Sequence, residues 1–352
     1  MKGAWFQGLR QRLFATPVDA AITLVCLYIV WCIAVPLVQW ALLDATWNGT
    51  SREACKADGA CWVFIRARFG QFMYGQYPDP QRWRVDLVAG LCVAAGLVLS
   101  WRGLPQRGRV TIATAIVVPV LGILLLHGSW GTGLKLVETR EWGGLMLTVF
   151  ITIYAGLVAV PLGILLALGR RSRLPLIRFF SVVFIEFWRG VPIITVIFLA
   201  SLLLPLIMPA GFDVDRLARA IVGLAFVIAA YMAEAVRGGL QALPEGQAEA
   251  AQALGLGYWR IQRMIVLPQA LRIALPAMTN EFIALFKNTT LVLIVSLFDL
   301  LGIAQAALAD PAWVGMNMEA YVFAGAIYWF TCFAMSQWSR RREKRLQAAY
   351  GR

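Results

Sequence analysis

Long apolar runs, each with few charged residues, constrain this chain more than any other feature of its sequence. The first run, residues 20–43, contains 24 residues and no charged side chain. A helix rises about 1.5 Å per residue, so a run of this length crosses a hydrocarbon core of about 30 Å. It is also longer than the apolar part of a signal peptide. The sequence therefore predicts an all-α polytopic membrane protein.

About eight transmembrane helices are expected from the apolar runs and the charges between them. They are predicted at residues 20–43, 87–100, 110–126, 143–169, 179–208, 217–233, 272–301 and 320–338. Lysine and arginine gather just outside several of these runs, most densely at 170–173 and 340–345. Positively charged loops stay in the cytoplasm, so both termini are predicted to be cytoplasmic.

The charge balance has the same explanation. The net charge is +13, which in a soluble protein would suggest nucleic-acid binding. Here the hydrophobic fraction is 60%, the mean hydropathy is +0.70, and the basic residues lie at the ends of apolar runs. We therefore expect a lipid bilayer around this chain, and no nucleic-acid partner.

Catalytic and metal-binding patterns are missing from the sequence. The single histidine, His127, argues against a histidine-based metal site, and no Gly-x-x-x-x-Gly-Lys-Ser/Thr phosphate loop occurs. We expect a chain that is not an enzyme and holds no metal or cofactor. If ATP drives it, another chain binds the ATP with its magnesium and hydrolyses it.

The segment 44–84 is predicted to be the largest external loop, and it contains two cysteines. Cys55 and Cys61 flank a turn-like stretch and can form a disulfide if the loop faces an oxidising compartment. Arg82 and Arg84 leave an alternative open, because basic residues there equally mark a cytoplasmic side.

A polar segment between two apolar runs is the strongest candidate for function. Residues 245–254 favour helix, and Gly255 and Gly257 are expected to end it. A second short helix is predicted at 258–266, ending near Leu267 and Pro268. Ala250 and Ala251 give the first helix a surface of little bulk, on which another protein can pack. The alternatives are a docking element and an ordinary cytoplasmic helical hairpin.

These residues carry a resemblance. Glu249, Ala250, Ala251 and Gly255, followed by Ile-Val-Leu-Pro at 265–268, resemble the coupling-loop signature of membrane subunits of bacterial ABC importers. Over about residues 140–345 the chain is similar to the polar amino-acid uptake permeases of the histidine/glutamine type. The resemblance rests on Trp-Gly-Gly-Leu at 142–145, Glu-Phe-Trp-Arg-Gly-Val-Pro at 186–192, Arg-Gly-Gly-Leu at 237–240 and Lys-Asn-Thr-Thr-Leu at 287–291. Asn288 departs from the pattern, since many relatives carry Asp there. The extra N-terminal spans and the cysteine loop resemble the general L-amino-acid permease branch.

The resemblance implies an architecture and a set of partners. Residues 1–139 would be an N-terminal extension with three spans, 140–340 a type I permease core of five helices with its coupling loop at 238–271, and 341–352 a basic cytoplasmic tail. The partners would be two ATP-binding subunits, a second permease that is a paralogue, and a periplasmic amino-acid-binding protein. Glu249, Ala250, Ala251, Gly255, Leu267 and Pro268 would lie at the ATPase contact in the bacterial inner membrane complex.

Charged and polar side chains inside the spans are candidates for the substrate path. Glu186 and Arg189 are three residues apart, which allows either a structural ion pair or a path-lining role. Glu234 and Arg237 have the same spacing and are expected to pair. Asn280 and Lys287, seven apart, share one helix face. The competing interpretation of the whole chain is a self-contained secondary transporter or channel, which would need coupling-ion carboxylates in mid-span.

Overall fold

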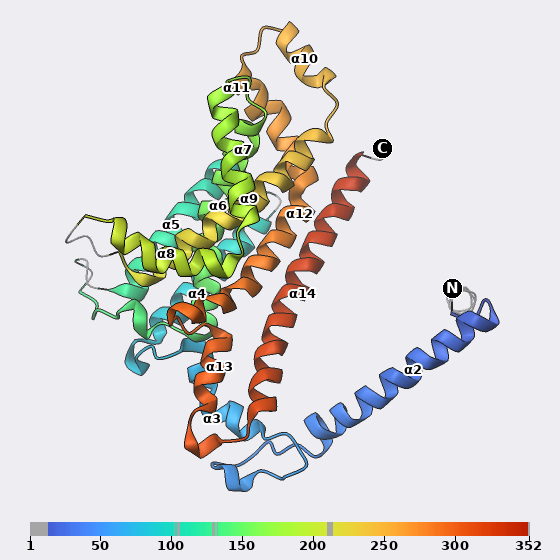
Figure 1. The fold of residues 1–352 in the computed structure, drawn as a ribbon, viewed down its shortest axis with the longest axis vertical. Coiled ribbons are helices and arrows are strands. Elements are labelled where there is room, and N and C mark those ends of the chain that lie inside the picture. The colour runs from blue at the N-terminus through green and yellow to red at the C-terminus, as the bar shows by residue number, and fades with distance from the viewer. Residues whose placement is uncertain are drawn as a thin grey trace. The chain divides into compact units, whose positions relative to one another are not determined.

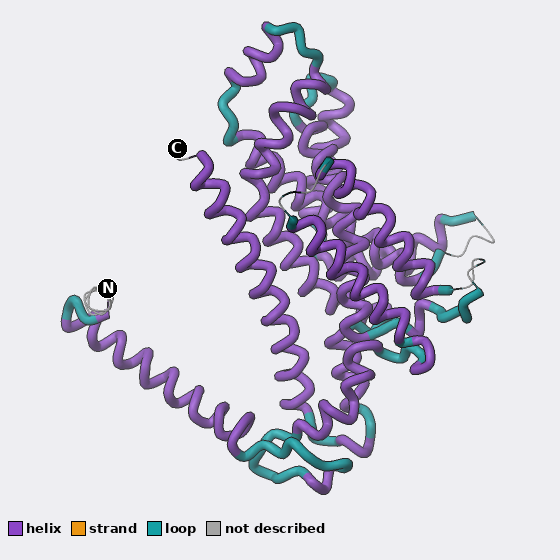
Figure 2. The backbone as a smooth tube through the Cα atoms, turned by 180° about the vertical axis from the view of Figure 1, so that it is seen from behind, coloured by secondary structure: helices purple, strands orange, loops and turns teal. Residues whose placement is uncertain are grey.

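The computed structural model describes residues 13–101, 103, 106–128, 131, 133–209 and 214–350. Residues 1–12 of the predicted N-terminal extension and 351–352 of the predicted tail lie outside the described residues. Over the described part of the chain the regular structure is helical, without a β-strand (Figure 2). The chain divides into two compact units, residues 1–69 with 308–322, and residues 70–307 with 323–352.

The first helix described in the first unit is α2, Pro17–Val38, which continues as a π-helical turn through Leu43. The Thr16 hydroxyl accepts a hydrogen bond from the Asp19 amide and the Asp19 carboxylate accepts one from the Thr16 amide, which closes a capping box. The helix is apolar on all sides and buries none of its residues. That pattern is expected of a helix surrounded by lipid.

The rest of the first unit is a compact loop region. Helix α3, Trp62–Tyr74, begins in it, and a 3₁₀ turn at Pro311–Trp313 lies in its second segment. The Phe64 and Trp313 ring centroids are 5.6 Å apart, and Arg68 forms an ion pair with Asp310. Aromatic packing and a charge pair therefore join residues that are about 245 positions apart in the sequence.

The second unit contains most of the membrane helices (Figure 1). The helices that it contains wholly or in large part are α4 Trp83–Ser100, α5 Arg107–His127, α6 Gly144–Arg170, α7 Pro175–Gly190, α8 Ile193–Ile207, α9 Arg216–Gln241, α10 Gly246–Ala253, α11 Tyr258–Ile261, α12 Leu267–Asn288, α13 Leu300–Leu308 and α14 Asn317–Tyr350. Its core lies around α9, which packs against α6, α7, α8 and α12.

Small residues set the closeness of the α6–α9 packing. A Cβ added at Gly163 would lie 2.6 Å from the Met232 Cβ and 3.0 Å from the Ala229 carbonyl oxygen. Small residues let the backbones of two membrane helices approach closely. This close packing holds the helices together, because lipid tails supply no hydrophobic drive toward association. The contact is therefore expected to be sensitive to any added side chain at this glycine.

Seven helices of the described residues are long and apolar enough to cross a membrane, or eight if one bent pair counts as a single span. This confirms the predicted all-α polytopic class. The span predicted at 179–208, with a break expected at residues 190–192, is divided there into α7 and α8, which meet at 106°. Val191 is extended, as the residue before a proline tends to be, so the helix stops at Gly190 and restarts after Pro192.

The span predicted at 272–301 also ends differently. Helix α12 ends at Asn288, a 3₁₀ segment runs over Thr289–Val295, and Ser296 takes a left-handed conformation with φ +57°. A new helix, α13, then starts at Leu300. A left-handed residue cannot continue a right-handed helix, so the apolar run divides there.

Candidate functional site

The predicted coupling loop lies between the end of α9 at Gln241 and the start of α12 at Leu267. Helix α10 occupies Gly246–Ala253, within the predicted 245–254. Gly255 follows with φ +77°, and its amide donates to the Gln252 carbonyl oxygen at 2.9 Å. Glycine takes this left-handed conformation at no steric cost, which explains why the helix ends here. Figure 1 shows α10 projecting beyond the ends of α9 and α12.

The second half of the loop is continuous with the following span. Helix α11, Tyr258–Ile261, passes through a π-helical turn at Gln262–Val266 directly into α12. The predicted helix end near Leu267 and Pro268 is therefore wrong. Pro268 is the second residue of α12 and directly follows the π-helical turn.

Exposure divides the predicted contact residues. Glu249, Ala250 and Gly255 are exposed, Ala251 is buried at 4%, and Leu267 and Pro268 are half-buried. Ala251 therefore fixes α10 to its own chain. The sequence interpretation missed three apolar side chains near the tip of the loop: Leu254 is 82% exposed and Trp259 and Met264 are each 69% exposed. A polar segment that displays such side chains has the composition of a docking surface.

Side-chain contacts hold α10 against the start of α12. The Gln269 amide nitrogen donates to Gln247 Oε1 at 2.7 Å and to the Ile265 carbonyl oxygen at 2.9 Å. A cleft of about 300 Å³ lies on the α10 side of this link, lined by Glu249 and by Arg171 and Arg173 from the turn after α6. The loop thus has a fixed position relative to two spans.

A cluster of five charged residues joins α6, α7 and α9. Its centre is Glu234, whose side chain is 18% exposed. Arg170 Nη1 lies 2.7 Å from Glu234 Oε1, Arg237 Nη2 lies 2.7 Å from Oε2, and Arg189 Nη1 is 4.0 Å from Oε2. The predicted pair of Glu234 and Arg237 is present. Three guanidinium groups around one carboxylate leave this region with positive charge.

Glu186 and Arg189 take different partners from those their spacing suggested. Glu186 Oε1 accepts from Arg170 Nη1 at 3.0 Å, while Arg189 turns toward Glu234 and stacks over the Tyr231 ring at 5.5 Å. Both therefore belong to the same cluster without pairing with each other. Asn280 and Lys287 are exposed on α12 and are not members of the cluster.

A buried carboxylate was not recognised as a site from the sequence. Asp299 is fully buried and caps α13, accepting from the Gly302 amide at 2.9 Å. The Tyr328 hydroxyl donates to its other oxygen at 2.7 Å. Burial raises the pKa of the Asp299 carboxyl, and these hydrogen bonds oppose that rise. Its role is to fix the start of α13, because its oxygens are occupied by its own chain.

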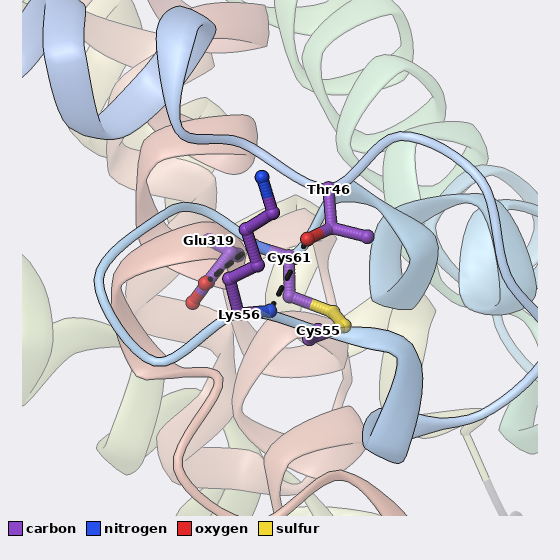
Figure 3. Close-up of a disulfide and its surroundings, with 5 residues drawn as sticks. All are labelled: Thr46, Cys55, Lys56, Cys61 and Glu319. Carbon is purple, nitrogen blue, oxygen red and sulfur yellow. Dashed lines mark hydrogen bonds between the residues drawn. A yellow bond between two sulfur atoms is a disulfide. The ribbon is translucent and has the colours of Figure 1, made fainter.

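The two candidate disulfide residues lie in the first unit (Figure 3). Cys55 and Cys61 are bonded through their sulfur atoms, with Cα atoms 5.4 Å apart. The Cys61 amide donates to the Glu319 carboxylate at 2.9 Å, and the Lys56 amide donates to the Thr46 hydroxyl at 3.2 Å. The small ring therefore presents one backbone donor to a carboxylate that is itself buried.

Comparison with known proteins agrees with this arrangement. Residues 159–348 match the family model of the binding-protein-dependent transport system inner membrane component. The chain is 50% identical to the inner membrane amino-acid ABC transporter permease YhdY of Escherichia coli K12, covering 96% of this chain and 92% of the relative. It is 36% identical to the glutamate/glutamine/aspartate/asparagine permease BztC of Rhodobacter capsulatus, covering 96% and 93%.

A solved structure is also similar. The crystal structure of an amino acid ABC transporter with histidines matches with a TM-score of 0.51 and 30% identity, covering 57% of this chain and 92% of that one. The match to a type I permease explains the five-helix core with an exposed loop between α9 and α12. The chain therefore belongs to the binding-protein-dependent inner membrane transport components and is a permease subunit of an amino-acid ABC importer.

Proposed function

We propose that this chain moves L-amino acids across the bacterial inner membrane by alternating access, with energy from ATP hydrolysed on partner subunits. Two ATP-binding subunits hold the ATP and its magnesium, a paralogous permease completes the path, and a periplasmic binding protein delivers the amino acid. Both termini lie in the cytoplasm, on the side of the coupling loop. This chain itself carries out no chemical step.

The observation that carries the proposal is the exposed coupling loop. Glu249 and Ala250 lie on the solvent face of α10, and Leu254 and Trp259 extend the surface with apolar groups. Small and apolar exposed groups are what a partner protein buries on docking. Since α11 continues into α12, a displacement of the docked loop acts directly on a span. ATP binding, which closes the ATPase dimer, would thereby reorient the permease helices.

The substrate path is proposed along α7 and α12. An amino acid needs a donor for its carboxylate and an acceptor for its ammonium group. Arg189 is the most loosely held of the three arginines in the cluster, since its Nη1 lies 4.0 Å from Glu234 Oε2. Lys287 and Asn280 are exposed on α12. These three groups supply donors, and Glu186, half-exposed beside Arg170, supplies an acceptor. Ionisable groups within membrane segments are costly, and those that are kept there usually serve such a role or pair with one another.

The coupling role is tested in proteoliposomes that contain the complete complex. Glu249→Arg and Gly255→Arg place a bulky cation on the docking surface, and we expect both to abolish ATP-driven uptake while the chain still inserts. Glu53→Arg is the matched control, since Glu53 is exposed in the first unit. Uptake by Glu249→Arg at the rate of the Glu53→Arg complex would contradict the coupling role.

The self-contained transporter or channel is distinguished by one further measurement. The tagged chain is purified and tested for a co-purifying ATPase, and uptake is measured with and without ATP. We expect an ATPase to accompany the chain and uptake to require ATP. Transport of amino acids by the chain alone, without ATP, would establish the alternative.

A further inference from the structure

A groove of about 520 Å³ lies between α12 and α14 in the second unit. Both helices belong to candidate membrane spans, and the groove lies along their membrane segments. The side chains that line it are apolar and come from both helices: Leu275, Met278 and Phe282 from α12, and Ala334, Met335 and Trp338 from α14. The space between these two spans is therefore open to an apolar occupant.

The one hydroxyl in the lining is already used. Thr279 Oγ1 donates to the Leu275 carbonyl oxygen at 2.8 Å, within α12 itself. The indole N–H of Trp338 is the remaining side-chain donor in the lining, and the lining includes no acidic side chain to accept from an ammonium group. An amino-acid substrate is a poor match for it, because burying a zwitterion without partners is costly.

One end of the groove carries a strong positive charge. The Arg342 guanidinium lies 5.3 Å from the centre of the Trp338 ring. Arg341 is exposed, and it lies three residues after Trp338 and seven after Ala334, which places it on the helix face that lines the groove. Arg272 is likewise exposed three residues before Leu275. Tryptophan is typical of the membrane interface, so this end lies at headgroup depth.

We propose that this groove binds an anionic phospholipid, with an acyl chain between α12 and α14 and the headgroup phosphate at Arg341 and Arg272. The choice of occupant follows from the combination of an apolar groove with a basic end. Basic pockets between transmembrane helices bind anionic headgroups in this way. An apolar helix of another subunit would fill the groove but would bring no anionic group to this basic end.

The test uses the full chain in nanodiscs, alone and in the complete complex. The probe is phosphatidylglycerol with brominated acyl chains, compared with phosphatidylcholine carrying the same chains. Quenching of Trp338 is taken as the difference between the wild-type chain and Trp338→Phe. We expect phosphatidylglycerol to quench at lower mole fraction than phosphatidylcholine, in the chain alone and in the complex.

Two substitutions separate the headgroup contact from the groove. Arg341→Gln should weaken the preference for phosphatidylglycerol about fivefold, which corresponds to about 1 kcal/mol per basic residue. Arg178→Gln, at an exposed arginine of α7, should leave it unchanged. Ala334→Phe should remove the quenching by filling the groove, while Ala94→Phe, at an exposed position of α4, should not.

Three results would overturn the proposal. One is equal quenching by the two lipids, and another is a preference that survives both Arg341→Gln and Ala334→Phe. The third is loss of all quenching in the complete complex, which would show that another subunit covers the groove. None of these results bears on whether the coupling loop binds the ATPase, so the two proposals fail separately.

Discussion

Truncation of Leu254 to alanine is predicted to weaken ATPase binding without destabilising the chain. The substitution removes three carbon atoms, each worth about 0.8 kcal/mol when it passes from water into an apolar contact. Leu254 is 82% exposed in the free chain, so docking can bury about that fraction of the side chain and yield about that fraction of the transfer free energy. The predicted loss is about 2 kcal/mol, or roughly 25-fold in the dissociation constant.

The assay is binding of the cognate ATP-binding subunit to the permease in nanodiscs, together with thermal unfolding of the permease alone. The free energy of unfolding should change by no more than about 0.5 kcal/mol, because an exposed side chain contributes little to the stability of the folded state. Leu206→Ala is the matched control, since Leu206 is 78% exposed on α8 and lies away from the loop. An unchanged dissociation constant for Leu254→Ala, or equal losses in the two variants, would refute the reasoning.

Three further predictions concern stability. Glu234→Gln should lower the free energy of unfolding by about 2 kcal/mol, a value between those of exposed and buried ion pairs. Glu186→Gln should lower it by less than about 1 kcal/mol. Both changes are measured by thermal unfolding in detergent. Gly255→Ala should cost about 1 kcal/mol because of its positive φ, whereas Gly257→Ala, at φ −69°, should cost no strain. Cys55→Ser opens a ring that spans residues 55–61 and should cost about 2 kcal/mol, measured as faster proteolysis of that loop.

Each of these predictions has a clear contrary result. Equal unfolding temperatures for Glu234→Gln and Glu186→Gln would show that Glu234 is not the centre of the cluster. Equal losses of unfolding free energy for Gly255→Ala and Gly257→Ala would show that the positive φ of Gly255 does not set the cost. Proteolysis of the Cys55→Ser loop at the wild-type rate would mean that hydrogen bonds alone hold it.

Features that depend on neighbours in sequence were predictable. Helix α10 and its end at Gly255 follow from helix propensity and from the freedom of glycine, and the Glu234–Arg237 pair follows from a spacing of three. The apolar runs predicted the membrane class because length and hydropathy alone decide whether a helix can cross a bilayer. In each case the physical cause lies within a few residues or one helix.

Features that depend on tertiary packing were not predictable from the sequence. Arg170 pairs with Glu186 across the turn between α6 and α7, so helix spacing gave Glu186 the wrong partner. The bend at Val191 was visible as a proline signal, but its 106° angle was not. Pro268 was taken as the end of a helix although proline is equally suited to a first turn, and only the structure distinguishes the two.

The unbroken helical path from Tyr258 to Val295 has a mechanical consequence. It contains 38 residues, whereas about 20 are enough to cross a bilayer, so a large part of it stands outside the hydrocarbon. Such a rod acts as a lever with its pivot in the membrane: tilting it moves its two ends in opposite directions. It departs from α-helical geometry at the π-helical turn Gln262–Val266, where backbone hydrogen bonds join residues five positions apart. If the ATPase binds the loop as proposed, a displacement at Trp259 would pass through that turn before it reached Asn280 and Lys287.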